Sequence, residues 1–139
     1  MITVLKPNDF EHIKKMIENK DKVKLRVDAG FGKKSITYIG GLGNVVFQLK
    51  EDNEENVSIH HMSFKNERKG LGTAVLEELI QYLAKNNKRK LFVENVTTRA
   101  MVEFCKKNGF KPVERQVYIK DDGCLYGNYQ LTIETEEVL

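Results

Sequence analysis

The sequence has little of what marks disulfide-rich, metal-binding or membrane-spanning proteins. Of its 139 residues, two are cysteines, two are prolines and none is tryptophan. Cys105 and Cys124 are too few for a disulfide framework and lack the spacing of metal ligands, so no metal is expected. No run approaches the ~18 apolar residues of a membrane span, and Met1 to Asp9 shows no signal peptide. These absences predict a cytoplasmic protein that does not bind membranes.

The residues that are present are those of a globular domain. Hydrophobic residues make up 40% of the chain and charged residues 31%, a balance that argues against disorder. Because domains usually contain about 100–200 residues, the chain is expected to form a single domain over residues 1–139.

The charge is small but unevenly distributed. The net charge is +3, yet segment 65–90 carries seven basic and three acidic residues, while segments 51–55 and 121–139 carry four and five acids and no base. This pattern favours a small anionic ligand near the middle of the chain. A nucleic-acid surface would need a larger basic excess with interleaved aromatic residues, so nucleic acid is not an expected partner.

Hydrophobic periodicity predicts strands and helices in an α/β (α+β) order. Period-2 alternation indicates strands, and apolar residues three and four apart indicate helices. We expect helices beginning near Pro7, after Thr73 and near Thr98, and strands at residues 1–5, 23–27, 35–39, 45–49, 57–64, 91–93, 111–120 and 125–133. This order predicts a sheet with helices packed on it.

The strand at residues 57–64 contains an irregularity. Val57 and Ile59 are apolar in one phase, whereas Met62 and Phe64 are apolar in the other. Alternation therefore slips by one residue at His60–His61, which predicts a β-bulge, a feature often found beside active sites. With one bulge, both imidazoles would face the polar side of the sheet.

The segment after this strand has the properties of an anion site. Arg68 and Lys69 bring positive charge, and Gly70 and Gly72 leave the backbone accessible just before a predicted helix. Unpaired N–H groups at a helix N-terminus bind phosphate or diphosphate well. The dinucleotide fingerprint would need glycine at the position of Val75, and no Walker pattern is present.

Two segments resemble motifs of the GNAT N-acetyltransferases. Residues 62–72, with sequence MSFKNERKGLG, look like the acyl-CoA-binding motif, and residues 98–110, with sequence TRAMVEFCKKNGF, look like the second motif. The resemblance implies a mixed, mostly antiparallel sheet flanked by helices, with a splayed parallel strand pair forming an acyl-CoA cleft. It also implies transfer of an acetyl group from acetyl-CoA to a primary amine, by direct attack in a ternary complex. The implied cofactor-binding residues are Met62, Ser63, Phe64, Arg68, Lys69, Gly70, Leu71, Gly72, Thr73 and Thr98.

Three positions depart from the family pattern. Glu67 stands where the family has Gln or Arg, Thr98 where it has Asn, and Cys105 where it has the Tyr that usually acts as general acid. Cys105 is therefore either a weak acid or a small buried hydrophobic residue.

Acetylation of an amine needs a group that accepts a proton. His60 is the first candidate, because imidazole titrates near neutral pH and the predicted bulge places it on the polar face. His61 is the second candidate, and Glu94, at the end of the next strand, is the carboxylate alternative.

Other interpretations stay open at this point. The chain could be a non-catalytic acyl-CoA-binding or protein-interaction module that kept the diphosphate site. The glycine-rich stretch 29–44 is expected to border the acceptor, and the acids at 51–55 and 121–139 would suit a cationic acceptor if they line the cleft. The strand at 125–133 could pair with itself across a homodimer.

Overall fold

A computed structural model describes residues 5–29, 34–65 and 70–134. It contains three α-helices, one short 3₁₀-helix and seven strands within these ranges. In chain order the elements are η1 (Pro7–Phe10), α1 (Glu11–Asp21), β1 (Leu25–Ala29), β2 (Ser35–Gly40), β3 (Val45–Glu51), β4 (Asn56–Ser63), α2 (Leu71–Lys85), β5 (Lys90–Val96), α3 (Arg99–Lys107), β6 (Lys111–Ile119) and β7 (Leu125–Thr132).

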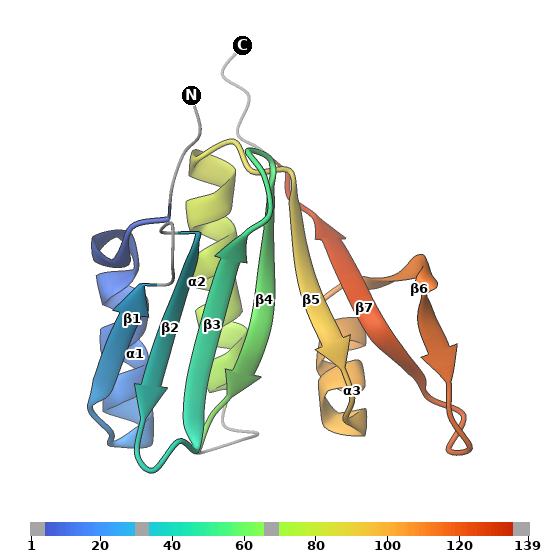
Figure 1. The fold of residues 1–139 in the computed structure, drawn as a ribbon, viewed down its shortest axis with the longest axis horizontal. Coiled ribbons are helices and arrows are strands. Elements are labelled where there is room, and N and C mark those ends of the chain that lie inside the picture. The colour runs from blue at the N-terminus through green and yellow to red at the C-terminus, as the bar shows by residue number, and fades with distance from the viewer. Residues whose placement is uncertain (1–4, 30–33, 66–69, 135–139) are drawn as a thin grey trace.

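The seven strands form one sheet in the order β1-β2-β3-β4-β5-β7-β6. Every neighbouring pair is antiparallel except β4 and β5, which run parallel. Helices α1 and α2 lie together behind β1 to β4, and α3 lies beside β5 and β7 (Figure 1). The expected fold, a mixed and mostly antiparallel sheet with helices and one parallel pair, is confirmed.

The core forms where α2 packs on the sheet. Leu71, Val75, Leu79 and Leu83 recur every four residues along α2 and are at most 2% exposed, because residues four apart share one face of a helix. On β2 and β3 burial alternates residue by residue, as expected for strands with one covered face. This packing fixes the position of the start of α2 relative to β4.

Several boundaries differ from the sequence prediction. Helix α2 begins at Leu71, before Thr73, because Gly70 adopts a left-handed conformation that starts the helix. The first described strand spans Leu25–Ala29, and Leu5 lies outside any strand. Residues 1–4 of the expected N-terminal strand lie outside the described residues.

The strand expected at residues 125–133 is not the edge strand that pairing with a second copy would need. Strand β7 lies between β5 and β6 and is hydrogen-bonded on both sides, so it has no free edge to offer a second copy. The edge strand on that side is β6. Among the helices of the described residues, none has the length and apolarity that crossing a membrane requires.

Candidate active site

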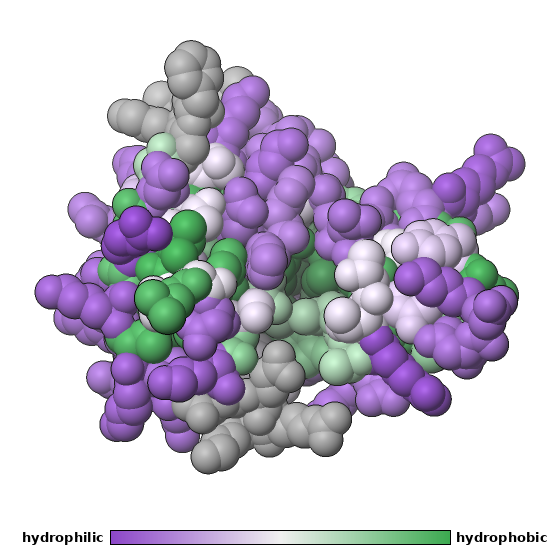
Figure 2. Space-filling view, turned by 60° about the horizontal axis from the view of Figure 1, so that its bottom comes forward, coloured by the Kyte–Doolittle hydropathy of each residue, from purple (hydrophilic) through white to green (hydrophobic). Residues whose placement is uncertain are grey.

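The parallel strands β4 and β5 separate partway along their length. Their pairing runs from Asn56 opposite Lys90 to Ile59 opposite Val93 and stops there. Beyond this point a cavity of about 770 Å³ opens between β4, β5 and the first turns of α2 and α3. Figure 2 looks toward this end of the molecule and shows the hollow with apolar side chains on its floor. Because the pairing ends, main-chain N–H and C=O groups of the later part of β4 are free to meet a ligand.

Two β-bulges meet at the point of separation. On β4, Ile59 pairs with Leu49 and His61 pairs with Gln48, so His60 is the extra residue. On β5, Val93 pairs with Tyr129 and Val96 with Gly127, which leaves two residues, Glu94 and Asn95, opposite one. The predicted bulge at His60–His61 is confirmed. The second bulge was not predicted, because the strand expected from the sequence ends at Val93, whereas β5 continues to Val96, where the buried positions change phase.

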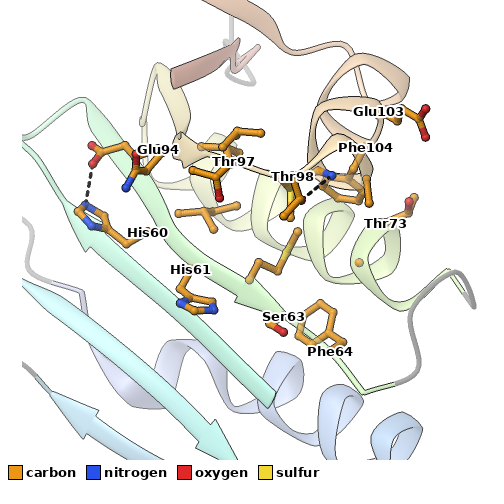
Figure 3. Close-up of a pocket in the computed structure, with 18 of the residues that line it drawn as sticks. His60, His61, Ser63, Phe64, Thr73, Glu94, Thr97, Thr98, Glu103 and Phe104 are labelled. Atoms are coloured by element: carbon orange, nitrogen blue, oxygen red, sulfur yellow. Dashed lines mark hydrogen bonds and ion pairs between the residues drawn. The ribbon is translucent and has the colours of Figure 1, made fainter. Parts of the chain in front are cut away.

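The two bulges bring His60 and Glu94 together. Nε2 of His60 lies 3.1 Å from Oε2 of Glu94, and the two side chains are 30% and 33% exposed. Figure 3 shows the pair at one end of the cleft, with His61 farther along the same strand. The Nε2 atom is shielded from solvent and has no well-aligned hydrogen-bond acceptor within the described part of the chain. The contact is therefore a close approach of the two side chains without hydrogen-bond geometry, and it places an imidazole beside the cleft.

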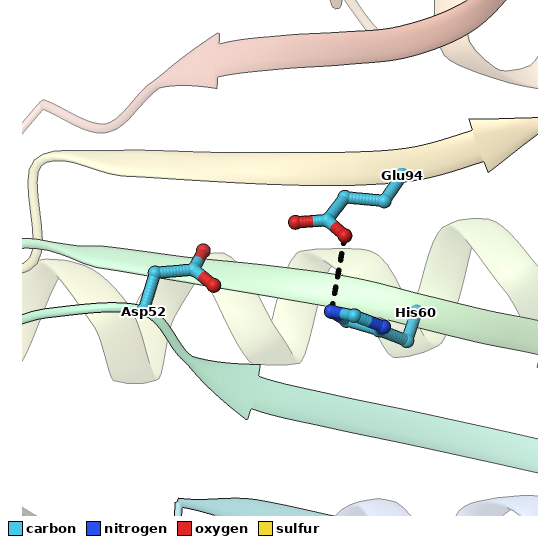
Figure 4. Close-up of side chains that lie close together, drawn as sticks. All are labelled: Asp52, His60 and Glu94. Atoms are coloured by element: carbon cyan, nitrogen blue, oxygen red, sulfur yellow. Dashed lines mark ion pairs between the residues drawn. The ribbon is translucent and has the colours of Figure 1, made fainter.

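A buried serine extends this pair to a second carboxylate. The Ser58 side chain is fully buried, and its Oγ lies 3.0 Å from Oε1 of Glu94. The same hydroxyl hydrogen-bonds Oδ2 of Asp52, an exposed residue after β3. One donor atom each of Asp52, His60 and Glu94 lies within 4.8 Å of the other two (Figure 4). Such a nitrogen and oxygen donor set is able to hold a divalent cation, although the sequence predicts no metal.

The N-terminus of α2 forms the opposite end of the cleft. Gly70 has φ +81°, and a Cβ placed there would meet no atom of the described residues within 4 Å. A Cβ at Gly72 would lie 3.1 Å from Cε1 of Phe104, so this glycine also lets α2 approach α3 closely. The first N–H groups of a helix have no intrahelical partner. Main-chain N–H groups of Leu71, Gly72 and Thr73 are thus available to an anion.

The other predicted cofactor-binding residues divide into three groups. Met62, Ser63, Phe64, Gly70, Gly72, Thr73 and Thr98 line the cleft. Leu71 has its side chain buried in the core, so only its backbone is available. Arg68 and Lys69 lie outside the described residues, as does Glu67. Thr98 caps α3, since its Oγ1 accepts a hydrogen bond of 3.3 Å from the Met101 N–H.

Cys105 lies in the core and does not line the cleft. Its side chain is fully buried, and burial raises the pKa of its thiol to about 12. A buried thiol in apolar surroundings is unreactive. The geometry therefore matches the packing role among the two that the sequence allowed. No tyrosine lines the cleft within residues 5–29, 34–65 and 70–134.

The structure also shows cleft residues that sequence reasoning missed. Ala100, Glu103, Phe104 and Lys107 line the cleft from α3. They follow the three- and four-residue spacing of one helix face, so periodicity could have found them. Asp52 and Ser58 belong to no motif, and only the fold places them beside Glu94.

Two expectations concern segments that the structure describes only in part. The described residues of stretch 29–44 do not line the cleft, and residues 30–33 lie outside the description. Among the described bases of segment 65–90, Lys85, Lys88, Arg89 and Lys90 lie at or after the C-terminal end of α2, the end opposite to the cleft. Lys88 is buried against Glu51, with Nζ 2.7 Å from Oε2.

Comparison with known proteins identifies the fold. No protein-family model matches the sequence, and no curated protein is significantly similar to it. Many solved structures are similar in fold. The ribosomal-protein-S18-alanine N-acetyltransferase of Escherichia coli is 18% identical, with a TM-score of 0.53 over 100% of this chain and 98% of that one.

Two further structures were solved with coenzyme A or its acetyl form. A GNAT family acetyltransferase from Elizabethkingia anophelis with acetyl-CoA bound is 14% identical, with a TM-score of 0.52 over 82% of this chain and 99% of that one. An aminoglycoside 6'-N-acetyltransferase complexed with coenzyme A is 10% identical, with a TM-score of 0.55 over 99% of both chains. The chain has the fold of the GNAT acetyltransferases.

Proposed function

We propose that this protein transfers an acetyl group from acetyl-CoA to a primary amine by direct attack in a ternary complex. One observation carries the proposal. The cleft between β4 and β5 has an open helix N-terminus at one end and the His60–Glu94 pair at the other. A diphosphate suits the first end and proton transfer suits the second. The GNAT fold of the chain supports the same reaction class.

Acetyl-CoA would supply the acetyl thioester, and the residues of the chain would hold it and move protons. Main-chain N–H groups of Leu71, Gly72 and Thr73 would bind the diphosphate, with Lys107 adding positive charge at the cleft wall. The unpaired backbone around Met62 and Ser63 would accept the amide groups of the pantetheine arm, as an added strand does.

The amine must lose a proton in order to attack the thioester. His60 would accept that proton, while Glu94 beside Nε2 orients the ring and stabilises the imidazolium that forms. The oxyanion of the tetrahedral intermediate needs a donor, and a bulged strand leaves main-chain groups unpaired at His60. His61 and Glu94 are the alternative bases.

The acceptor is proposed only as a class, a primary amine on a small molecule or on a protein. The similar structures include an enzyme named for the alanine of a ribosomal protein and one named for aminoglycosides. Glu94 and Glu103 line the cleft, so an acceptor that carries positive charge is favoured.

Two measurements on the purified protein test the proposal. Titration calorimetry with acetyl-CoA should show saturable binding, and adenosine 3',5'-bisphosphate should compete with it. Free-thiol release should then rise when amines of several classes are added. The absence of acetyl-CoA binding would overturn the proposal.

A second candidate function is a non-catalytic acyl-CoA-binding module. The observation that favours it is the lack of a tyrosine in the described cleft, together with the buried position of Cys105. This candidate predicts acetyl-CoA binding without thiol release for any amine, so the same two measurements separate it from the enzyme.

A further inference from the structure

We propose that Ser58 and Asp52 form a proton exit from the catalytic pair to solvent, a role that rests on the proposed acetyl transfer. The four side chains form a continuous series. His60 contacts Glu94 at 3.1 Å, Glu94 contacts Ser58 at 3.0 Å, and Ser58 hydrogen-bonds Asp52. The series begins at a cleft residue and ends at an exposed carboxylate.

The hydrogen-bond donors and acceptors of this series can accommodate one additional proton. The Ser58 hydroxyl carries a single hydrogen, yet its oxygen lies in hydrogen-bonding range of two carboxylates, those of Asp52 and Glu94. With both carboxylates ionised, only one of the two contacts is a hydrogen bond. A proton carried on the Glu94 oxygen that faces Ser58 makes both contacts hydrogen bonds. The trio can therefore accept a proton from His60 without leaving a buried polar group unsatisfied.

The position of each residue suits an exit path. Ser58 is fully buried and has no direct contact with solvent. Asp52 is exposed and does not line the cleft, whereas His60 and Glu94 do. Bound acetyl-CoA and amine would fill the cleft and exclude water from it. Asp52 would then offer the catalytic pair a route to bulk solvent outside the filled cleft.

The proton balance of one turnover is simple. The amine gives one proton to His60. Once a small rotation of the ring aligns the 3.1 Å contact, the Nε2 proton of the imidazolium passes to Oε2 of Glu94. Rotation of the protonated Glu94 carboxyl group brings its O–H to the side of Ser58. The Ser58 hydroxyl then releases its own proton to Asp52 as it receives the proton of Glu94. Asp52 passes the proton to water, which restores the protonation states of Glu94, Ser58 and Asp52. The His60 imidazole is left with its hydrogen on the nitrogen that took the amine proton, and it regains its starting tautomer by a ring flip or by exchange with solvent. Ser58 and Asp52 act through Glu94 and His60, so they are positioning and relay residues.

The test compares Asp52→Asn with Glu55→Gln. Both changes remove one negative charge from the same turn, but Glu55 contacts Arg89 in an exposed ion pair and is not part of the series. Asp52→Asn should lower kcat about tenfold and leave the KM for acetyl-CoA unchanged. High concentrations of a tertiary-amine buffer, which cannot itself be acetylated, should restore the rate. Asp52→Glu should keep most of it, and Glu55→Gln should behave as wild type.

A second measurement tests the series without relying on turnover. The ¹⁵N resonances of the His60 imidazole should shift in Asp52→Asn and Ser58→Ala and stay in place in Glu55→Gln. Wild-type kcat in Asp52→Asn, or equal losses in Asp52→Asn and Glu55→Gln that buffer does not restore, would overturn the relay. Unchanged His60 resonances in both network variants would overturn it as well. Failure of the wild type to acetylate any amine would instead overturn the proposed function.

Discussion

Nε2 of His60 lies 3.1 Å from Oε2 of Glu94 at the point where two parallel strands stop pairing. Each residue belongs to a β-bulge on its own strand. A bulge re-aims the side chains next to it, so the pair exists because both strands are irregular at the same level of the sheet. The close-up in Figure 3 shows the two side chains pointing toward each other.

Replacing His60 should affect the chemical step and spare binding. His60→Gln is expected to lower turnover at neutral pH by about two orders of magnitude, because a general base contributes roughly 10²–10⁴-fold. The affinity for acetyl-CoA should stay within about twofold of wild type. Thiol release across pH and calorimetric titration measure the two effects.

The matched control for His60 is His12→Gln. His12 also pairs with a glutamate, Nε2 lying 3.3 Å from Oε2 of Glu78, but this pair joins α1 to α2 and does not line the cleft. The His12→Gln variant should have the same turnover as wild type. Equal turnover of His60→Gln and wild type at every pH would remove His60 from the mechanism.

Substitution of Gly70 should weaken acetyl-CoA binding beyond its effect on stability. Its φ of +81° costs about 1 kcal/mol for alanine, and a Cβ there projects into open space at the helix N-terminus. We expect Gly70→Ala to raise the Kd for acetyl-CoA about tenfold, or ~1.4 kcal/mol. Calorimetry measures the affinity and urea unfolding measures the stability.

Gly123→Ala is the control that separates loss of stability from loss of acetyl-CoA affinity in Gly70→Ala. Gly123 has φ +78° and, like Gly70, an empty Cβ position, but it lies in the β6–β7 turn and does not line the cleft. The Gly123→Ala variant should lose a similar amount of stability and keep its full affinity for acetyl-CoA. Equal acetyl-CoA affinity in both variants would contradict a diphosphate site at α2.

Gly127 should be intolerant of any side chain. Its φ is +118°, and a Cβ would lie 2.3 Å from the main-chain oxygen of Gln116 and 2.9 Å from Cα of Val117. These atoms are backbone and cannot move aside cheaply. We expect Gly127→Ala to destabilise the fold by at least about 2 kcal/mol and to lower Tm by roughly 5–10 °C.

Thermal unfolding followed by circular dichroism tests this prediction, with Gly43→Ala as control. Gly43 has φ +89° and no atom within 4 Å of its Cβ position, so it suffers the backbone cost without the clash. A Gly127→Ala loss no larger than that of Gly43→Ala would show that the β6–β7 pairing adjusts freely.

Cys105 should make stability fall as the pH rises above 9. Burial raises the pKa of its thiol to about 12 from an ordinary 9.0. Between these values the unfolded chain has released the proton and the folded chain has kept it, so alkali favours unfolding. Below pH 9 the thiol is protonated in both states and the full contribution remains.

Cys105→Ala should therefore reduce the slope with which the free energy of unfolding falls above pH 9, by up to about 1.4 kcal/mol per pH unit. Urea unfolding at several alkaline pH values measures the slope, which is independent of any constant loss from the smaller side chain. Burial also raises the pKa of Tyr38 and Tyr82, but this contribution is common to wild type and variant. Cys124→Ala is the matched control, and an unchanged slope in Cys105→Ala would contradict the prediction.

Local patterns in the sequence predict much of the fold. Three features act within a few residues of the chain and can therefore be read from the sequence: the four-residue apolar spacing of α2, the glycine at its start and the Asn108–Gly109 end of α3. The bulge at His60 is also readable, because a slip in alternation is a local property of one strand.

The assembled site was decided by tertiary structure. Glu94 meets His60 only because β5 pairs in parallel beside β4, and Asp52 and Ser58 join them only because β3 returns antiparallel to β4. The core position of Cys105 and the internal position of β7 likewise depend on packing between distant segments. Short-range periodicity records which face of an element is apolar, whereas the partner of a polar side chain is set by contacts between strands that no local pattern encodes.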